Sequence, residues 1–78
     1  MKFVAQRVLR ATLTVNGQLV SEIGRGLVVF LGVKTDDGVV KAEKIAEKIA
    51  KLRVFSDENG KMNLCVRDIV GEVLLVSQ

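Results

Sequence analysis

The 78-residue sequence predicts an α+β domain in which mostly antiparallel strands curl around one amphipathic helix. Three observations support this fold class. Several short segments alternate apolar and polar residues, one stretch in the middle repeats its apolar residues at helical spacing, and glycine-containing turns separate the segments. Apolar residues make up 49% of the chain, which favours a globular core. The length allows a single domain, residues 1–78.

The first fifteen residues alternate as a strand with one exception. The odd positions from 3 to 15 are apolar except for Arg7, which stands in the apolar register. A bend near Val8 and Leu9 could turn Arg7 outward. Otherwise this arginine points at a group that requires a cation or a fork of N–H donors. The sequence leaves both interpretations open.

Two turns and a buried strand are predicted next. Asn16 and Gly17 both tolerate the positive φ of a tight hairpin turn, so they predict a hairpin between the flanking strands. The Gly24-Arg25-Gly26 segment predicts the following turn. The apolar run from Leu27 to Leu31 then predicts a strand that is covered on both faces.

One helix is predicted from about Gly38 to Leu52. Asp36 and Asp37 precede it, where carboxylates favour the positive end of the helix dipole. The apolar residues at helical spacing form one stripe. They are Val39, Ala42, Ile45, Ile49 and Leu52.

A second stripe of this helix consists of lysines. Its members are Lys41, Lys44, Lys48 and Lys51. Such a row could follow the phosphate backbone of a nucleic acid. It is also typical of a solvated helix face, on which Glu47 and Lys51 would form a supporting ion pair.

The last third of the chain predicts a turn and two further strands. Residues 57–60 (Asp-Glu-Asn-Gly) predict the turn, residues 62–67 alternate as a strand, and Gly71 interrupts the pattern. The chain then ends with Val-Leu-Leu-Val-Ser-Gln. These apolar residues predict a fully buried strand, with the hydroxyl of Ser77 and the amide of Gln78 at its tip.

The residue types that are absent exclude several kinds of site. Without histidine the chain cannot form a Ser-His or Cys-His nucleophile or a histidine-bound zinc site, and its single cysteine, Cys65, cannot form a thiolate cluster. No metal or cofactor is therefore expected. The apolar runs are too short to span a membrane, and one cysteine suits a reducing cytoplasm. The net charge of +3 permits an anionic partner such as RNA and is also ordinary.

An ordered set of segments resembles a known family. The segments are QRV at 6–8, IGRGLVVFLGV at 23–33, KIAKLRVFSDENGKMNL at 48–64 and VLLVSQ at 73–78. Together they resemble the N-terminal half of the D-aminoacyl-tRNA deacylases, also called D-tyrosyl-tRNA deacylases, over the whole chain. The resemblance implies the N-terminal half of that fold and a cytoplasmic homodimer. It also implies hydrolysis of the ester of D-aminoacyl-tRNA, a chiral proofreading step in translation.

The resemblance also implies roles for individual residues. Ser77 and Gln78 match the first two polar positions of a motif that lines the aminoacyl pocket, and Gln78 would donate a hydrogen bond to the ester carbonyl. Arg7 would fix the pocket wall at the dimer interface. Family members are understood to hold the carbonyl and align a water, while a ribose hydroxyl of the substrate assists, so histidine is not needed.

The family's remaining elements are not present in these 78 residues. The pocket threonine and a glycine–cis-proline pair, which excludes L-amino acids, belong to the C-terminal half, and this chain has no proline. The expected partners are the aminoacylated 3′ end of tRNA and either a second copy or the missing half. Three functions stay open: a deacylase present as a fragment or split protein, a non-catalytic RNA-binding module, and a remnant that only folds or associates.

Overall fold

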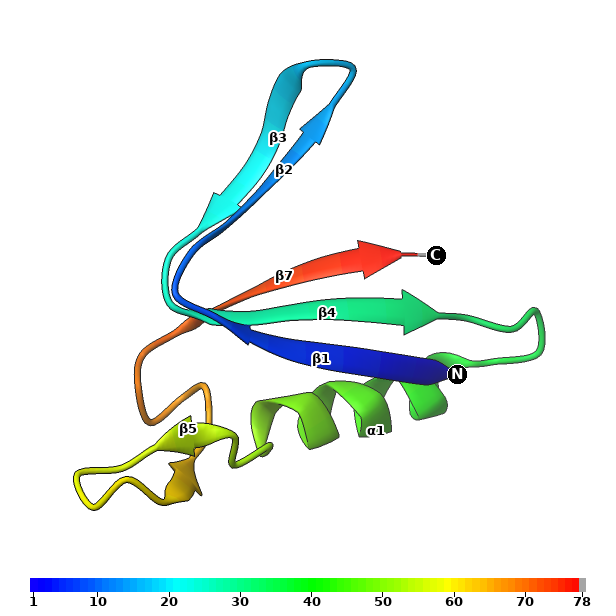
Figure 1. The fold of residues 1–78 in the computed structure, drawn as a ribbon. Helices are drawn as coiled ribbons and strands as arrows, with labels where there is room; N and C mark the ends of the chain where they lie inside the picture. The colour runs from blue at the N-terminus through cyan, green and yellow to red at the C-terminus, as the bar shows by residue number, and fades with distance from the viewer. Residues whose placement is uncertain (78) are drawn as a thin grey trace.

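The computed structural model describes residues 1–77 and confirms the α+β class (Figure 1). The elements in chain order are β1 (Lys2–Val8), β2 (Ala11–Val15), β3 (Gln18–Ile23), β4 (Gly26–Gly32), α1 (Val39–Ala50), β5 (Phe55–Ser56), β6 (Met62–Leu64) and β7 (Glu72–Ser77). The main sheet has the order β1-β4-β7, whereas β2 pairs with β3 and β5 with β6. Helix α1 runs along one face of the main sheet, and the β2–β3 hairpin projects away from it (Figure 1).

Strand β4 is the centre of the main sheet. It is antiparallel to β1 and parallel to β7, while the other strand pairs are antiparallel. The parallel pair arises because the chain crosses over through α1 and returns to the same end of the sheet. A Cβ on Gly26 would overlap the carbonyl oxygen of Glu72, so the start of β4 requires glycine. The predicted burial of this strand is confirmed for Leu27, Val28 and Val29, whereas Phe30 and Leu31 are partly buried.

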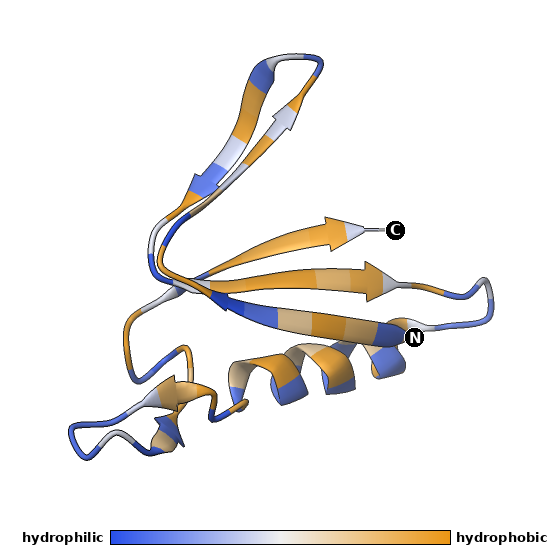
Figure 2. Cartoon of the chain, in the orientation of Figure 1, coloured by the Kyte–Doolittle hydropathy of each residue, from blue (hydrophilic) through white to orange (hydrophobic). Residues whose placement is uncertain are grey.

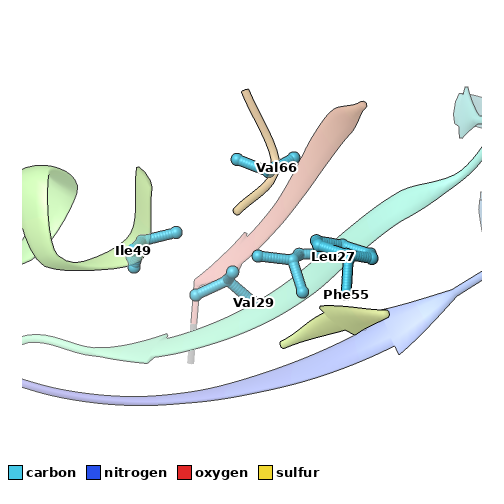
Figure 3. Packing of buried hydrophobic residues seen from close by; sticks show 5 residues of the cluster. All are labelled: Leu27, Val29, Ile49, Phe55 and Val66. Atoms are coloured by element: carbon cyan, nitrogen blue, oxygen red, sulfur yellow. The ribbon is translucent and has the colours of Figure 1, made fainter. Parts of the chain in front are cut away.

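The main core lies between α1 and the sheet. Its buried members are Leu27, Val29, Ile49, Phe55 and Val66 (Figure 3). Figure 3 shows that these side chains come from β4, α1, β5 and the segment after β6, so the core joins α1, β5 and that segment to β4. The first turn of the helix does not share in this core, because Val39 is 73% exposed.

Asp37 directly precedes the N-cap of α1, as predicted, and its carboxylate has further partners. The N-cap residue is Gly38, and it makes no side-chain cap. The Asp37 carboxylate is fully enclosed and accepts hydrogen bonds from the Met1 amine at 2.8 Å, the Lys34 N–H at 2.9 Å and Lys41 Nζ at 3.1 Å. These bonds lower its pKa below the ordinary value, the Met1 bond most of all. Asp37 therefore ties the start of β1 to the start of α1.

The turns predicted at residues 16–17 and 57–60 form as expected. Asn16 (φ 52°) and Gly17 (φ 78°) connect β2 to β3, and the hairpin packs Ile23 into a second, smaller core with Val28 and Leu74. In the turn between β5 and β6, the Asp57 carboxylate accepts hydrogen bonds from the N–H groups of residues 59 and 61. Bonds from these backbone N–H groups lower the Asp57 pKa.

The prediction of a fully buried last strand is wrong for one face of β7. Leu74 is buried against the hairpin side, but Val73 is 43% exposed and Leu75 54% exposed. Strand β7 lies at the edge of the sheet, and the core beneath α1 takes residues from β1 and β4 but none from β7. Figure 2 shows β7 as a strongly apolar strand at this open edge.

Candidate functional site

The residues predicted to form the pocket lie at opposite ends of the main sheet. Ser77 is exposed at the end of β7 and pairs with Leu31, whereas Arg7 pairs with Leu27 near the other end of β4. This offset of four residues corresponds to about 13 Å along the strands. One chain therefore does not bring Arg7 and Ser77 into the same pocket. Gln78 lies outside the described residues.

Arg7 keeps the apolar register of β1 and reaches a carbonyl group. The predicted bend is present at Leu9, but it follows the pairing of Arg7 with Leu27 and does not turn the side chain to the other face. The Arg7 Nη1 donates a hydrogen bond to the carbonyl oxygen of Val54 at 2.9 Å. Of the two interpretations left open, the structure favours the one in which Arg7 points at an acceptor. This bond uses one of five guanidinium donors.

A cavity of about 300 Å³ lies beside Arg7. Its lining residues are Arg7, Val8, Leu9, Arg25, Phe55 and Ser56. The guanidinium carbon of Arg25 lies 5.6 Å from the centroid of the Phe55 ring, within the range of a cation–π contact. No carboxylate from residues 1–77 lines the cavity, and its polar side chains are those of Arg7, Arg25 and Ser56.

Sequence reasoning missed Arg25, Phe55 and Ser56 as neighbours of Arg7. The Gly-Arg-Gly segment predicted a turn, and that turn does place Arg25 beside the end of β1. Phe55 is 2% exposed, and its ring lies in the main core. The sequence predicted Arg7 in a strand just before a bend and Arg25 in a turn. That the two arginines line one cavity depends on the register between β1 and β4, which the sequence did not predict.

The end of the sheet that holds Ser77 has a second hollow, of about 260 Å³. It is lined by Met1, Lys2, Gly32, Val33 and Lys34. The start of β1 and the end of β7 lie at this end of the sheet (Figure 1). None of the described residues of β7 lines this hollow.

The lysine row on α1 is exposed, and its members differ in their partners. Lys41 pairs with Asp37 at 3.1 Å, and Lys51 pairs with Glu47 at 2.8 Å, as predicted for the latter. The bond from Lys51 lowers the Glu47 pKa. Lys44 and Lys48 form no ion pair within residues 1–77. Half of the row therefore keeps its charge available to an anionic partner.

The described residues offer little conventional catalytic machinery. No group of three His, Cys, Asp or Glu side chains in residues 1–77 could hold a metal ion. The Asp68 carboxylate accepts a hydrogen bond from the Cys65 N–H at 2.8 Å, which holds the Asp68 pKa low and gives it a structural partner. Helix α1, the one helix of the described part, is neither long nor apolar enough to cross a membrane. The side chains that line the cavity beside Arg7 offer hydrogen-bond donors and positive charge.

A family model and several named proteins match all or nearly all of this chain. The family model described as D-Tyr-tRNA(Tyr) deacylase matches residues 4–78. The chain is 50% identical to a D-aminoacyl-tRNA deacylase from Dictyoglomus turgidum and 58% identical to one from Koribacter versatilis, in each case over all 78 residues. These matches cover 50% and 52% of the two relatives, so the chain spans about half the length of the curated relatives it matches.

A solved structure has the same fold. The protein named c-Myc DNA Unwinding Element Binding Protein superposes with a TM-score of 0.94 at 48% identity, and the match covers 100% of this chain and 53% of that one. At this identity the likeness extends from fold to sequence, in agreement with the family match. The 78 residues therefore belong to the D-Tyr-tRNA(Tyr) deacylase family and correspond to its N-terminal half.

Proposed function

We propose that these 78 residues supply half of an enzyme that hydrolyses the ester of D-aminoacyl-tRNA. The observation that carries this proposal is the family match over residues 4–78, together with relatives named D-aminoacyl-tRNA deacylase at 50–58% identity. The second half of the fold completes the enzyme. The proposed reaction takes place in the cytoplasm, where aminoacyl-tRNA is made and used.

The proposed chemistry depends on positioning rather than on a strong nucleophile. An aminoacyl ester is already labile, so hydrogen-bond donors that hold its carbonyl and align a water are sufficient. Ser77 lines the aminoacyl pocket at the tip of β7, and Gln78 donates to the carbonyl oxygen as negative charge develops there. A ribose hydroxyl of the substrate assists the water, which agrees with a chain that has no histidine.

In this proposal Arg7 acts at the opposite end of the main sheet from Ser77. Its separation from Ser77 by about 13 Å along the sheet supports a role at a pocket of the partner subunit in a homodimer, where residues of two chains meet. The exposed lysines Lys44 and Lys48, and their paired neighbours Lys41 and Lys51, contact the tRNA backbone. No cofactor takes part.

The test is a gain of activity. The 78 residues are fused to the C-terminal half of the Koribacter versatilis relative, and release of labelled amino acid from D- and L-aminoacyl-tRNA is measured. We expect the fusion to release the D-amino acid and to spare the L-amino acid. Gln78→Ala in the fusion should lower the rate about tenfold or more, as the loss of an oxyanion donor does. A folded fusion without D-selective hydrolysis would contradict the proposal.

A second candidate is a non-catalytic RNA-binding or dimerising remnant of the family. The unpaired Lys44 and Lys48, and two guanidinium groups at a cavity without carboxylates, favour this alternative. It predicts that the folded fusion binds tRNA with an affinity that falls steeply with salt, but hydrolyses neither substrate. The same assay therefore separates the two functions.

A further inference from the structure

The helix-side face of β7 is an exposed apolar surface. In register with β4, Val73 lies beside Leu27 and Leu75 beside Val29, so the four side chains share one face of the sheet. The β4 pair is fully buried, but Val73 and Leu75 are 43% and 54% exposed. The apolar layer beneath α1 thus stops at the boundary between β4 and β7.

The outer edge of β7 is also open and carries none of the usual protection. In the described part of the chain β4 is its one neighbour in the sheet, so the N–H and C=O groups on its other side have no strand partner. Natural edge strands are commonly protected by lysine, proline or a bulge. Strand β7 has none of these, and its one charged residue, Glu72, accepts a hydrogen bond from the Gly24 N–H at its inner end.

We infer that this face of β7, centred on Val73 and Leu75, is the docking surface for the C-terminal half that the relatives carry. The inference rests on family membership and on the length of the relatives, not on the proposed activity. The chain matches 50–53% of the relatives and of the solved neighbour, and β7 is the last element before the match ends. Consecutive elements usually lie side by side, so a chain continuing from β7 meets this surface first.

Other exposed apolar residues do not offer the same continuity. Val15, Leu19 and Val20 lie on the β2–β3 hairpin, which projects away from the main sheet (Figure 1). Val4 is 67% exposed on β1, at the opposite edge of the main sheet from β7. Val4 therefore serves as a matched control for Leu75, because both are exposed apolar residues on edge strands.

Amide hydrogen exchange tests the docking surface. Exchange at residues 73–77 is compared between the 78-residue chain and its fusion to the C-terminal half of the Koribacter versatilis relative. Covering β7 makes local opening rarer, so we expect exchange there to slow about tenfold or more in the fusion. Leu75→Lys in the fusion should remove this protection, whereas Val4→Lys should keep it. Exchange in β4 reports whether each variant remains folded.

Two results would overturn the inference. One is equal exchange in β7 for the folded chain and the folded fusion. The other is protection of β7 in the fusion that falls on dilution, together with dimers in sedimentation, because a second copy would then occupy the surface. A fusion that protects β7 but hydrolyses no substrate would support the docking surface and contradict the proposed function alone.

Discussion

Strands β4 and β7 pair residue by residue, yet their helix-side residues have opposite surroundings. Leu27 and Val29 of β4 are fully buried, whereas their neighbours Val73 and Leu75 in β7 are about half exposed. The two strands have similar apolar sequences, so the difference comes from what covers them. Helix α1, β5 and the segment after β6 pack over β1 and β4 and stop short of β7. The comparison separates a covered side of the main sheet from a partly exposed one.

The sharpest test of this comparison is a pair of leucine substitutions. Leu27→Ala should lower the free energy of unfolding by about 2–5 kcal/mol, because it leaves a cavity in the main core. Leu75→Ala should change it by no more than about 0.5 kcal/mol in the 78-residue chain, because its side chain is already half in water. Urea denaturation of both variants gives the values. Equal losses would show that the two faces do not differ as described.

A smaller effect on stability is expected at Asp37, which connects the start of β1 to the start of α1. Its pKa is lowered in the folded state, so it contributes stability that is complete above its ordinary pKa of 3.8 and is lost as the pH falls below that value. Asp37→Asn should reduce the urea midpoint at neutral pH. It should also make the loss of stability between about pH 4 and pH 2 shallower.

The acid dependence should not vanish in Asp37→Asn. The pKa values of Asp57 and Asp68 are also lowered by hydrogen bonds from backbone N–H groups, and these carboxylates remain in the variant. An unchanged midpoint and an unchanged acid slope would mean that the contacts to Met1, Lys34 and Lys41 do not stabilise the fold.

A smaller effect on stability than that of Leu27→Ala is expected at Arg7. Arg7→Ala removes the exposed hydrogen bond to the Val54 carbonyl and should cost no more than about 1 kcal/mol. In the active fusion it should nevertheless impair hydrolysis of D-aminoacyl-tRNA, if the arginine serves a pocket wall. A large loss of stability with normal specific activity would make Arg7 structural instead.

The features that followed from the sequence are those with local causes. Asn16 and Gly17 specify their hairpin through their backbone preferences, and the apolar spacing of residues 39–52 specifies the helix to within one or two residues of each end. The burial of Leu27 to Val29 follows from a continuous apolar run. Each of these depends on neighbours within a few positions in the chain.

The features that were missed depend on distant segments. The parallel pairing of β4 with β7 brings together residues separated by more than forty positions, and it decides which face of β7 is covered. The Asp37 carboxylate forms an ion pair with the Met1 amine, which is distant in the sequence. Arg25 lines the same cavity as Arg7 because β1 and β4 pair in one register. Of the predicted catalytic residues, Ser77 is exposed at the tip of β7, and its role stays a prediction.

The most direct measurement of the central claim is the activity of the 78 residues alone. Release of labelled D- and L-amino acid from aminoacyl-tRNA is followed with the folded chain at a concentration at which the fusion is active. Positioning supplies most of the proposed catalysis, and the chain spans only about half the length of the relatives, so we predict little or no release of either amino acid. Efficient release of the D-amino acid with sparing of the L-amino acid by this chain alone would contradict the proposal that hydrolysis requires the second half of the fold.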